Sequence, residues 1–283
     1  MAFFITILDT FRTLVAVRSL RPFLAVWIML CSNTALSFGA DGHRIVVNIA
    51  ENHISPKTAS AIGAIIGDAD LDLLSLWPDK IRHLPAWKQS KYWHYINIDD
   101  REPFNNLKRN SDGDVLAALE HFYAELQDPQ LGNKQKIEAL AFFMHFVADI
   151  HQPLHVGRRD DRGGNSIEVK WLHQPTRANL HQVWDSLILK QENKTPLEYS
   201  QRLERAHAGQ VTRWQQSHFL QWAKESKALR NQVYNFSPEI QRKRTTISPA
   251  YIERNKPIIE QRLLMAGIRL AGYLNRIFDP SGQ

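Results

Sequence analysis

Beyond residue 38, apolar and polar positions follow one another with the spacing of α-helices. Apolar residues recur three or four positions apart, which places them on one face of a helix. The helix expected over 134–149 is apolar on several faces, so we expect it to lie at the centre of the fold. The pattern predicts helices over 42–53, 58–66, 114–126, 134–149, 178–191, 196–214, 217–234 and 249–277.

One stretch has a period of two instead. Between residues 163 and 172, Ile167, Val169 and Trp171 alternate with charged residues. Such alternation is typical of a strand with one buried face, and we expect it to form a short hairpin. The chain has no internal repeat, low-complexity tract or linker. The pattern therefore predicts one mainly α domain with a small β-hairpin.

The first residues have the pattern of a signal peptide. Three arginines precede an apolar run over 22–31, PFLAVWIMLC, and small residues stand at Ala35 and Ser37. We expect cleavage to remove 1–37 and to leave a mature domain over 38–283, in a secreted or periplasmic protein. An uncleaved membrane anchor is the alternative, although the run is shorter than the about 20 residues that a membrane-spanning helix needs.

Composition narrows the chemistry. Of the 283 residues, 43% are hydrophobic and 23% charged, which excludes a disordered chain. The net charge of +6 suits a polyanionic partner without requiring one. The single cysteine, Cys31, lies in the segment expected to be removed, so neither an intramolecular disulfide nor a cysteine-rich zinc finger is possible. A metal ion would need histidine and carboxylate ligands, and the chain has 12 histidines.

Two histidine–aspartate pairs have a spacing that suits metal binding. His145 and Asp149 are four residues apart, as are His181 and Asp185. Residues i and i+4 share a helix face, so each pair can direct an imidazole and a carboxylate to one point. An ordinary hydrogen-bonded pair is the alternative. His145 and Asp149 argue against it, because they interrupt one of the most apolar helices, where charges are rare unless paired or metal-bound.

Four further residues gain interest from these pairs. His43 lies near the start of the mature chain, and His155 follows the proline that ends a predicted helix. Taken singly, Asp79 fits a surface turn and His94 fits a core histidine that a backbone carbonyl satisfies. Taken with the helical pairs, all four are candidate ligands. We interpret His151, in the same segment as His155, as a core residue or as a residue that supports the ligands, and not as a ligand.

The order of these residues and the sequence around them resemble the S1/P1 nuclease family, the zinc-dependent single-strand-specific nucleases. The resemblance extends over the mature chain, including AGIRLAGYLN at 266–275, which is similar to the family's last helix. It implies a single compact helical domain that acts on single-stranded DNA and RNA, without stable membrane association after processing. It does not imply an oligomer. The matching segments are FGADGH at 38–43, WPD at 77–79, HYIN at 94–97, MHFVADIHQPLH at 144–155, GGN at 163–165 and NLHQVWD at 179–185.

The resemblance implies three zinc ions, held by histidines, carboxylates and the backbone of the first mature residue. The expected ligands of the first ion are Asp79, His94, His145 and Asp149. Those of the second ion are His155, His181 and Asp185. Those of the third ion are His43, the amino group and carbonyl oxygen of Phe38, and Asp149, which bridges to the first ion.

The resemblance also implies how the substrate is held and cut. A water shared by two zinc ions would lose its proton and attack phosphorus in line, which leaves 5′-phosphates on the products. Asp79 is expected to orient this water, and Arg82 to bind a phosphate oxygen. Tyr95 is expected to stack on a nucleobase, although a core aromatic is the alternative. Asn165 is expected to contact the base or another part of the substrate.

Some features depart from the family pattern. Phe38 stands where the mature chain usually begins with Trp. Asn97 stands where eukaryotic members have Asp, which leaves the base preference open. Those members also carry disulfides. The charged loop over 158–162 is expected to be solvated, and its place beside the candidate site also allows it to contact phosphates.

Two other functions fit part of the pattern. A zinc phospholipase C shares the three-zinc cluster of the superfamily, but it would need a choline pocket and an exposed apolar surface. GGN, Tyr95 and NLHQVWD favour the nuclease. A non-catalytic exported zinc-binding protein would be supported by the loss of a ligand, whereas all the expected side-chain ligands are present.

Overall fold

The computed structural model describes residues 39–172, 177–206, 214–236, 240–241 and 244–281. The predicted signal segment and Phe38 lie outside these residues. None of the described helices combines the length and the hydrophobicity that crossing a membrane requires.

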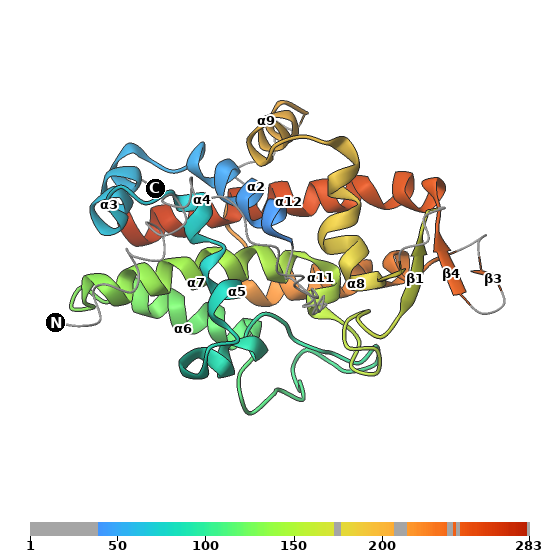
Figure 1. Cartoon of the computed structure of the whole chain (residues 1–283). Helices are drawn as coiled ribbons and strands as arrows, with labels where there is room; N and C mark the ends of the chain where they lie inside the picture. Colours follow the sequence, from blue (N-terminus) through green and yellow to red (C-terminus); the bar gives the residue numbers. More distant parts are fainter. Residues whose placement is uncertain (1–38, 173–176, 207–213, 237–239, 242–243, 282–283) are drawn as a thin grey trace, which may run out of the picture. The chain divides into compact units, whose positions relative to one another are not determined.

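The helix expected at the centre of the fold is α7 (Asn133–His151), and its central position is confirmed. Every residue from Ala139 to His151 is buried. Around α7 lie α2 (Ala40–Glu51), α6 (Val115–Gln127), α11 (Phe219–Val233) and α12 (Pro249–Phe278). Figure 1 shows α12 and α7 running side by side, with α6 along the other side of α7. The apolar faces of these helices bury one another, and the mainly α fold class is confirmed.

Shorter helices complete the structure. α3 (Pro56–Ile66) and α9 (Pro196–Ala206) fall within or close to predicted ranges. The segment over 67–113, for which the apolar spacing predicts no element, contains α4 (Leu71–Leu74), α5 (Trp77–Ile81) and the 3₁₀ helix η1 (Pro85–Tyr92). Another 3₁₀ helix, η2 (Pro153–Val156), follows α7. These elements are too short to show a helical period in the sequence.

The predicted hairpin is confirmed and belongs to a larger sheet. β1 (Glu168–Trp171) pairs antiparallel with β2 (Arg177–Asn179). β4 (Arg244–Ile247) pairs parallel with β1, and β3 (Ile240–Gln241) covers the far edge, in the order β2-β1-β4-β3. The alternation in the sequence did not reveal β3 and β4, because these strands are very short.

The helix expected over 178–191 is wrong at its start and in its regularity. Residues up to Asn179 belong to β2, and the Asn179 side chain caps the helical segment that follows by accepting from the backbone N–H of Gln182. That segment begins as α8 (Leu180–Gln182), widens into the π-helical turn η3 (Val183–Leu187), and ends in the 3₁₀ helix η4 (Leu189–Glu192). π-helical turns are often found at functional sites.

Candidate metal centre

Asp149 on α7 lies at the meeting point of four elements. It is fully buried, and so is His145 one turn earlier. α2 contributes His43, whose ring stacks on that of His145 with centroids 3.8 Å apart. α5 contributes Asp79, and the segment after η1 contributes His94. Three residues from distant parts of the sequence, His43, Asp79 and His94, thus converge on the helix predicted to be central.

The two oxygens of Asp149 face different histidines. Oδ2 lies 3.1 Å from His94 Nδ1 and 3.3 Å from His145 Nε2, while Oδ1 lies 3.5 Å from His43 Nε2. The Asp79 Oδ1 atom lies 3.8 Å from the same His94 and His145 nitrogens. The four residues Asp79, His94, His145 and Asp149 therefore direct one atom each toward a common point, and His43 approaches from the other side of Asp149.

A second group of ligand-type residues lies where η2 meets the α8–η3 segment. His181 Nε2 lies 3.1 Å from Asp185 Oδ2, and His155 Nε2 lies 3.7 Å from Asp185 Oδ1. All three residues are buried. The π-helical turn keeps His181 and Asp185 on one side, so the expected pairing of these two residues survives the irregular helix.

Backbone carbonyls orient three of the histidines. The Nδ1 atoms of His145, His155 and His181 each lie 2.7 Å from a carbonyl oxygen, contributed by Ser75, His94 and Gly163 respectively. A ring that donates through Nδ1 presents the lone pair of Nε2, which is how metal-binding histidines are usually held. Among the described residues, His155 Nε2 is buried without a hydrogen-bond partner, and the buried Asp185 Oδ2 has only the ion-pair contact with His181 Nε2. A divalent cation would satisfy both atoms, so these residues fit a metal ion.

The electrostatics of the centre favour cations. Burial alone would raise the pKa of Asp149, but the nearby His145 and His155 outweigh it and hold that pKa well below its ordinary value. Burial would likewise lower the pKa of His155, but Asp149 and Asp185 raise it to about 9. The carboxylates thus stay ionised in the interior, and positive charge must compensate for them. Metal binding here would release protons from the histidines.

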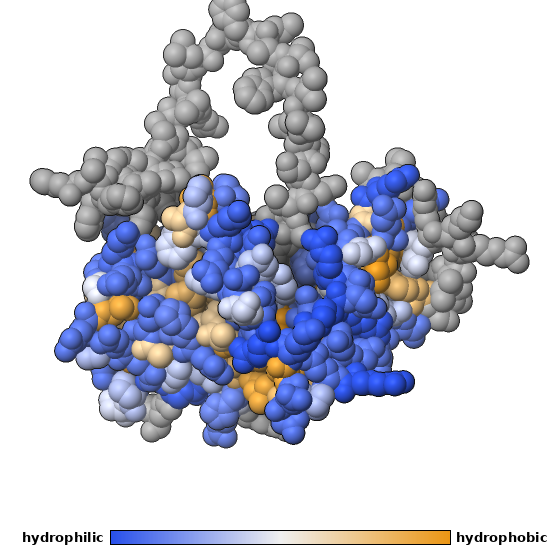
Figure 2. Space-filling view, turned by 90° about the horizontal axis from the view of Figure 1, so that it is seen from below, coloured by the Kyte–Doolittle hydropathy of each residue, from blue (hydrophilic) through white to orange (hydrophobic). Residues whose placement is uncertain are grey.

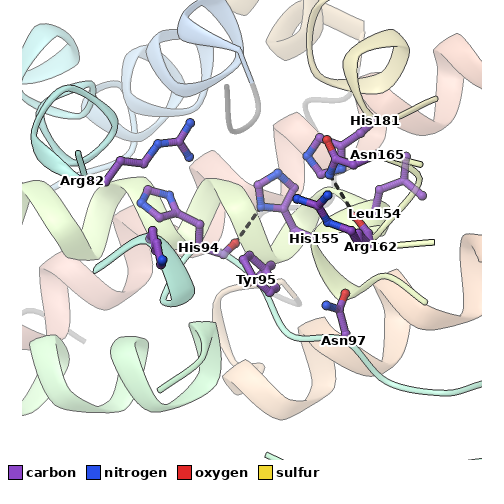
Figure 3. Close-up of a pocket in the computed structure, with 10 residues that line it drawn as sticks. Arg82, His94, Tyr95, Asn97, Leu154, His155, Arg162, Asn165 and His181 are labelled. Atoms are coloured by element: carbon purple, nitrogen blue, oxygen red, sulfur yellow. Dashed lines mark hydrogen bonds between the residues drawn. The ribbon is translucent and has the colours of Figure 1, made fainter. Parts of the chain in front are cut away.

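A pocket opens beside both groups of ligands (Figure 3). His94, His155 and His181 form part of its wall, and Tyr95, Arg82 and Asn165 line it as well. Tyr95 is half-buried and borders the pocket, so it does not lie in the core. Arg82 Nη1 lies 3.2 Å from Asp79 Oδ1, and Asn165 donates through Nδ2 to the Arg162 carbonyl. The predicted substrate-binding residues therefore line the same pocket as three of the predicted metal ligands.

Comparisons with known proteins agree with this arrangement. The family model of the S1/P1 Nuclease matches residues 38–279. The chain belongs to the S1/P1 nuclease family. Endonuclease 4 of Arabidopsis thaliana is 32% identical over 92% of this chain and 96% of its own. Nuclease P1 of Penicillium citrinum is 27% identical over 85% and 97%, and Nuclease S1 of Aspergillus oryzae is 26% identical over 91% and 97%.

Membership of the S1/P1 family makes the protein a nuclease, a hydrolase that acts on phosphodiester bonds of nucleic acids. S1/P1 nucleases are metal-dependent, and the buried clusters of this chain offer groups that could hold metal ions. The expected ligand Phe38 lies outside the described residues. Its neighbour Gly39 packs so tightly that a Cβ there would lie 3.0 Å from the Asp185 carbonyl oxygen. The start of the described chain is therefore next to the second ligand group.

Two residues of the centre, Gln152 and Lys91, were not predicted from the sequence. Gln152 donates through Nε2 to Asp185 Oδ1 at 2.7 Å. It lies between two candidate ligands in the sequence, within the family segment at 144–155, and both features could have pointed to it. Lys91 lines the pocket, as does Arg162 of the charged loop over 158–162. Arg162 has a φ of 57°, in the left-handed region that non-glycine residues rarely adopt.

The charged loop and His151 behave largely as expected. Arg158 pairs with Asp100 and Arg159 pairs with Glu102, so these two arginines are compensated on the protein surface. Arg162 of the same loop reaches the pocket. His151 is buried and contacts the Val147 carbonyl through Nδ1, which confirms a core role in place of a ligand role.

Proposed function

We propose that the protein is an exported endonuclease that uses three zinc ions to hydrolyse single-stranded DNA and RNA, leaving 5′-phosphates on its products. The observation that carries this proposal is the position of Asp149. One of its oxygens faces His94 and His145, the other faces His43, and a further group of three buried ligands lies nearby. A carboxylate in this position can serve two ions at once.

The proposed ligands follow the three groups of side chains. Histidine nitrogens and carboxylate oxygens are the groups that zinc prefers in the absence of cysteine. The first ion is assigned to Asp79, His94, His145 and Asp149. The second ion is assigned to His155, His181 and Asp185. The third ion is assigned to His43, Asp149 and the backbone amino and carbonyl groups of Phe38. Zinc supplies Lewis acidity, which lowers the pKa of water and offsets the charge of the phosphodiester.

The side chains of the pocket then bind and orient the reactants. Asp79 accepts a hydrogen bond from the attacking water and aims it at phosphorus. Arg82, beside Asp79, binds a non-bridging phosphate oxygen through its guanidinium. Asn165 donates through its side-chain amide to the Arg162 carbonyl within the loop, which leaves its own side-chain oxygen to accept from the base.

Tyr95 supplies the preference for single strands. Its ring borders the pocket that the candidate metal ligands line, and it is half-buried. A base can stack on this ring only when it has left a double helix, because a paired base is held within the stack. Stacking accepts every base, which fits cleavage of both DNA and RNA.

Export and processing complete the proposal. Cleavage after Ser37 frees an α-amino group at Phe38, and its reference pKa of about 7.7–8.0 allows a metal ion to displace the proton. The tight packing of Gly39 against Asp185 supports a position for this amino group near the ligands. The protein is then secreted or periplasmic and has no stable membrane association after processing.

The surface argues against a phospholipase. Among the described residues only Leu84, Leu197 and Leu220 are large hydrophobic side chains classed as exposed. Figure 2 shows one face of the molecule, where hydrophilic residues dominate and apolar residues form small groups. An enzyme that works on a lipid surface would be expected to present a broader apolar patch there.

Three substrates tested side by side separate the candidate functions. Processed protein is incubated with single-stranded DNA, single-stranded RNA and phosphatidylcholine vesicles, with duplex DNA as a further comparison. We expect hydrolysis of both single strands, slower hydrolysis of the duplex, and products that a 5′-phosphate-dependent exonuclease degrades. Hydrolysis of phosphatidylcholine alone would support the phospholipase, and hydrolysis of none of the substrates by zinc-loaded protein would support a non-catalytic role.

A further inference from the structure

A second pocket adjoins the pocket beside the candidate metal ligands. It has a volume of about 350 Å³, which lies within the range of about 300–1,000 Å³ that is typical of ligand pockets. The two pockets share Tyr95 and Asn97, and the second one extends toward the loop over 108–114. The proposed catalytic residues do not use this space.

The wall of the second pocket is held in place by hydrogen bonds to the segment that carries His94. The backbone N–H of Val115 donates to the Tyr95 carbonyl, and Trp93 Nε1 donates to the Asp112 carbonyl at 3.0 Å. Gly113 has a φ of 100°, and a Cβ there would lie 2.8 Å from the Trp93 ring, so only glycine fits. The pocket is therefore preformed, and its position relative to the ligands is fixed.

The negative charge in this pocket is already compensated. The carboxylate of Asp114 is buried, and both of its oxygens accept hydrogen bonds from the Arg109 guanidinium. The same carboxylate also caps α6, where it accepts from two backbone N–H groups. Arg159, on another part of the wall, donates to Glu102 at 2.9 Å.

One positive charge remains free to bind a ligand. Within the part of the chain that the structure describes, the ammonium group of the exposed Lys108 makes no hydrogen bond or ion pair. Asn110 uses its side-chain oxygen to accept from the Asp112 N–H, which leaves its own N–H groups available. The neighbouring pocket adds the guanidinium of Arg162, which likewise has no carboxylate partner among the described residues. Positive charge and hydrogen-bond donors thus continue from one pocket into the next.

We propose that the second pocket is an additional subsite for a single-stranded polynucleotide. The nucleotide next to the one bound at the metal centre lies there, with Lys108 on its phosphate and Asn110 donating to its sugar or base. Tyr95 and Asn97 stand where the strand passes from one pocket to the other. This inference rests on the proposed function, and it adds that the enzyme binds at least two consecutive nucleotides, one in each pocket, with Tyr95 between them.

Substrate length provides the test. The variant Lys108→Ala is compared with the wild type on a dithymidylate without terminal phosphates and on an octathymidylate. The single phosphate of the dithymidylate is the one that is cleaved, so only the octathymidylate offers a further phosphate to Lys108. The matched control is Lys170→Ala, an exposed lysine on β1 that lines neither pocket. Loss of one charge-assisted contact is expected to raise the KM of the octanucleotide about tenfold relative to that of the dinucleotide. The control variant is expected to change neither KM.

Binding to metal-free protein gives a second readout that does not depend on catalysis. In EDTA, the affinity for the octanucleotide is measured at several salt concentrations. One phosphate contact fewer should reduce the slope of log K against log salt by about 0.7 in Lys108→Ala. An Asn110→Ala variant is expected to weaken binding while leaving this slope unchanged.

The outcomes separate the subsite from the proposed function. An octanucleotide KM and a salt slope that stay at wild-type values in Lys108→Ala would overturn the subsite, even if the enzyme cleaves single strands. Equal effects on both substrate lengths would also overturn it. If the wild type hydrolyses neither substrate but binds the octanucleotide through Lys108 in EDTA, the subsite stands and the proposed catalytic function fails.

Discussion

Replacing Asp149 with asparagine tests whether one carboxylate serves two metal ions. Asp149 Oδ2 lies 3.1 Å from His94 Nδ1, and Oδ1 lies 3.5 Å from His43 Nε2. An amide keeps the shape of the side chain, but it loses the charge and presents an N–H₂ group in place of one oxygen. Two of the three proposed ions lose a ligand in this way. We therefore expect the zinc content to fall from three ions per chain to one.

Asp185→Asn is the matched control, because Asp185 belongs to only one of the proposed sites. It is buried like Asp149 and has a similar set of histidine neighbours. This variant should lose one ion and keep two. Zinc is counted by elemental analysis after gel filtration, and circular dichroism checks that each variant is folded. We expect Asp149→Asn to lower kcat by more than about 100-fold, since even residues that only orient a metal ligand contribute 10–100-fold.

Two results would refute this reasoning. A folded Asp149→Asn protein that retains three zinc ions and near-normal turnover would show that the carboxylate is not a ligand. Equal losses of zinc in Asp149→Asn and Asp185→Asn would show that Asp149 serves one ion only. In either case the division of the ligands into three groups would have to be redrawn.

Three further predictions concern the surroundings of the metal ions. Tyr95→Ala should lower kcat/KM on single-stranded DNA by a factor that corresponds to about 1–3 kcal/mol of transition-state stabilisation, with unchanged zinc content. Tyr95→Phe should stay close to the wild type, and unchanged kinetics in Tyr95→Ala would exclude stacking. Gln152→Ala removes the donor that orients Asp185 and should lower the affinity for one zinc ion about 10–100-fold in a chelator titration. Zinc affinities that all equal those of the wild type would contradict this. Protein made with one extra residue before Phe38 should hold two zinc ions and be less active than the processed form, and three ions with full activity would show that the amino terminus is not a ligand.

Much of the candidate centre could be predicted because its residues lie in recognisable local patterns. His145 and Asp149 stand in an apolar helical segment that has little other reason to carry charge. The structure confirms that this segment is the buried helix α7 and that both residues are fully buried. The match to known family segments then placed the other ligand candidates in order along the chain.

The region over 67–113 could not be predicted by the same reasoning. Its helices α4 and α5 are four and five residues long, and isolated helices of that length are unstable in water. They persist because side chains such as Leu74 and Ile81 are buried against the rest of the core. Local amphipathic repeats in the sequence do not indicate these elements, because they depend on contacts made by distant parts of the chain.

The sheet and Gln152 show two other limits. β4 was missed because its partner β1 lies more than 70 positions earlier in the sequence, and a four-residue strand carries too little alternation to indicate such a pairing. Gln152 is an amide, so a search for ionisable ligands passes over it. Its role becomes visible only when the structure places its Nε2 against Asp185 Oδ1.

The centre and the core of this nuclease are the same part of the fold, and this coincidence has a physical consequence. Burying Asp149 and Asp185 would be highly unfavourable without positive charge close by. The protein surrounds both carboxylates with histidines, and the two carboxylates in turn raise the pKa of the buried His155 to about 9. A divalent cation would provide the same compensation with more charge, and it would also satisfy His155 Nε2, which has no hydrogen-bond partner among the described residues. The groups that stabilise the interior are therefore the ones that would hold the catalytic ions.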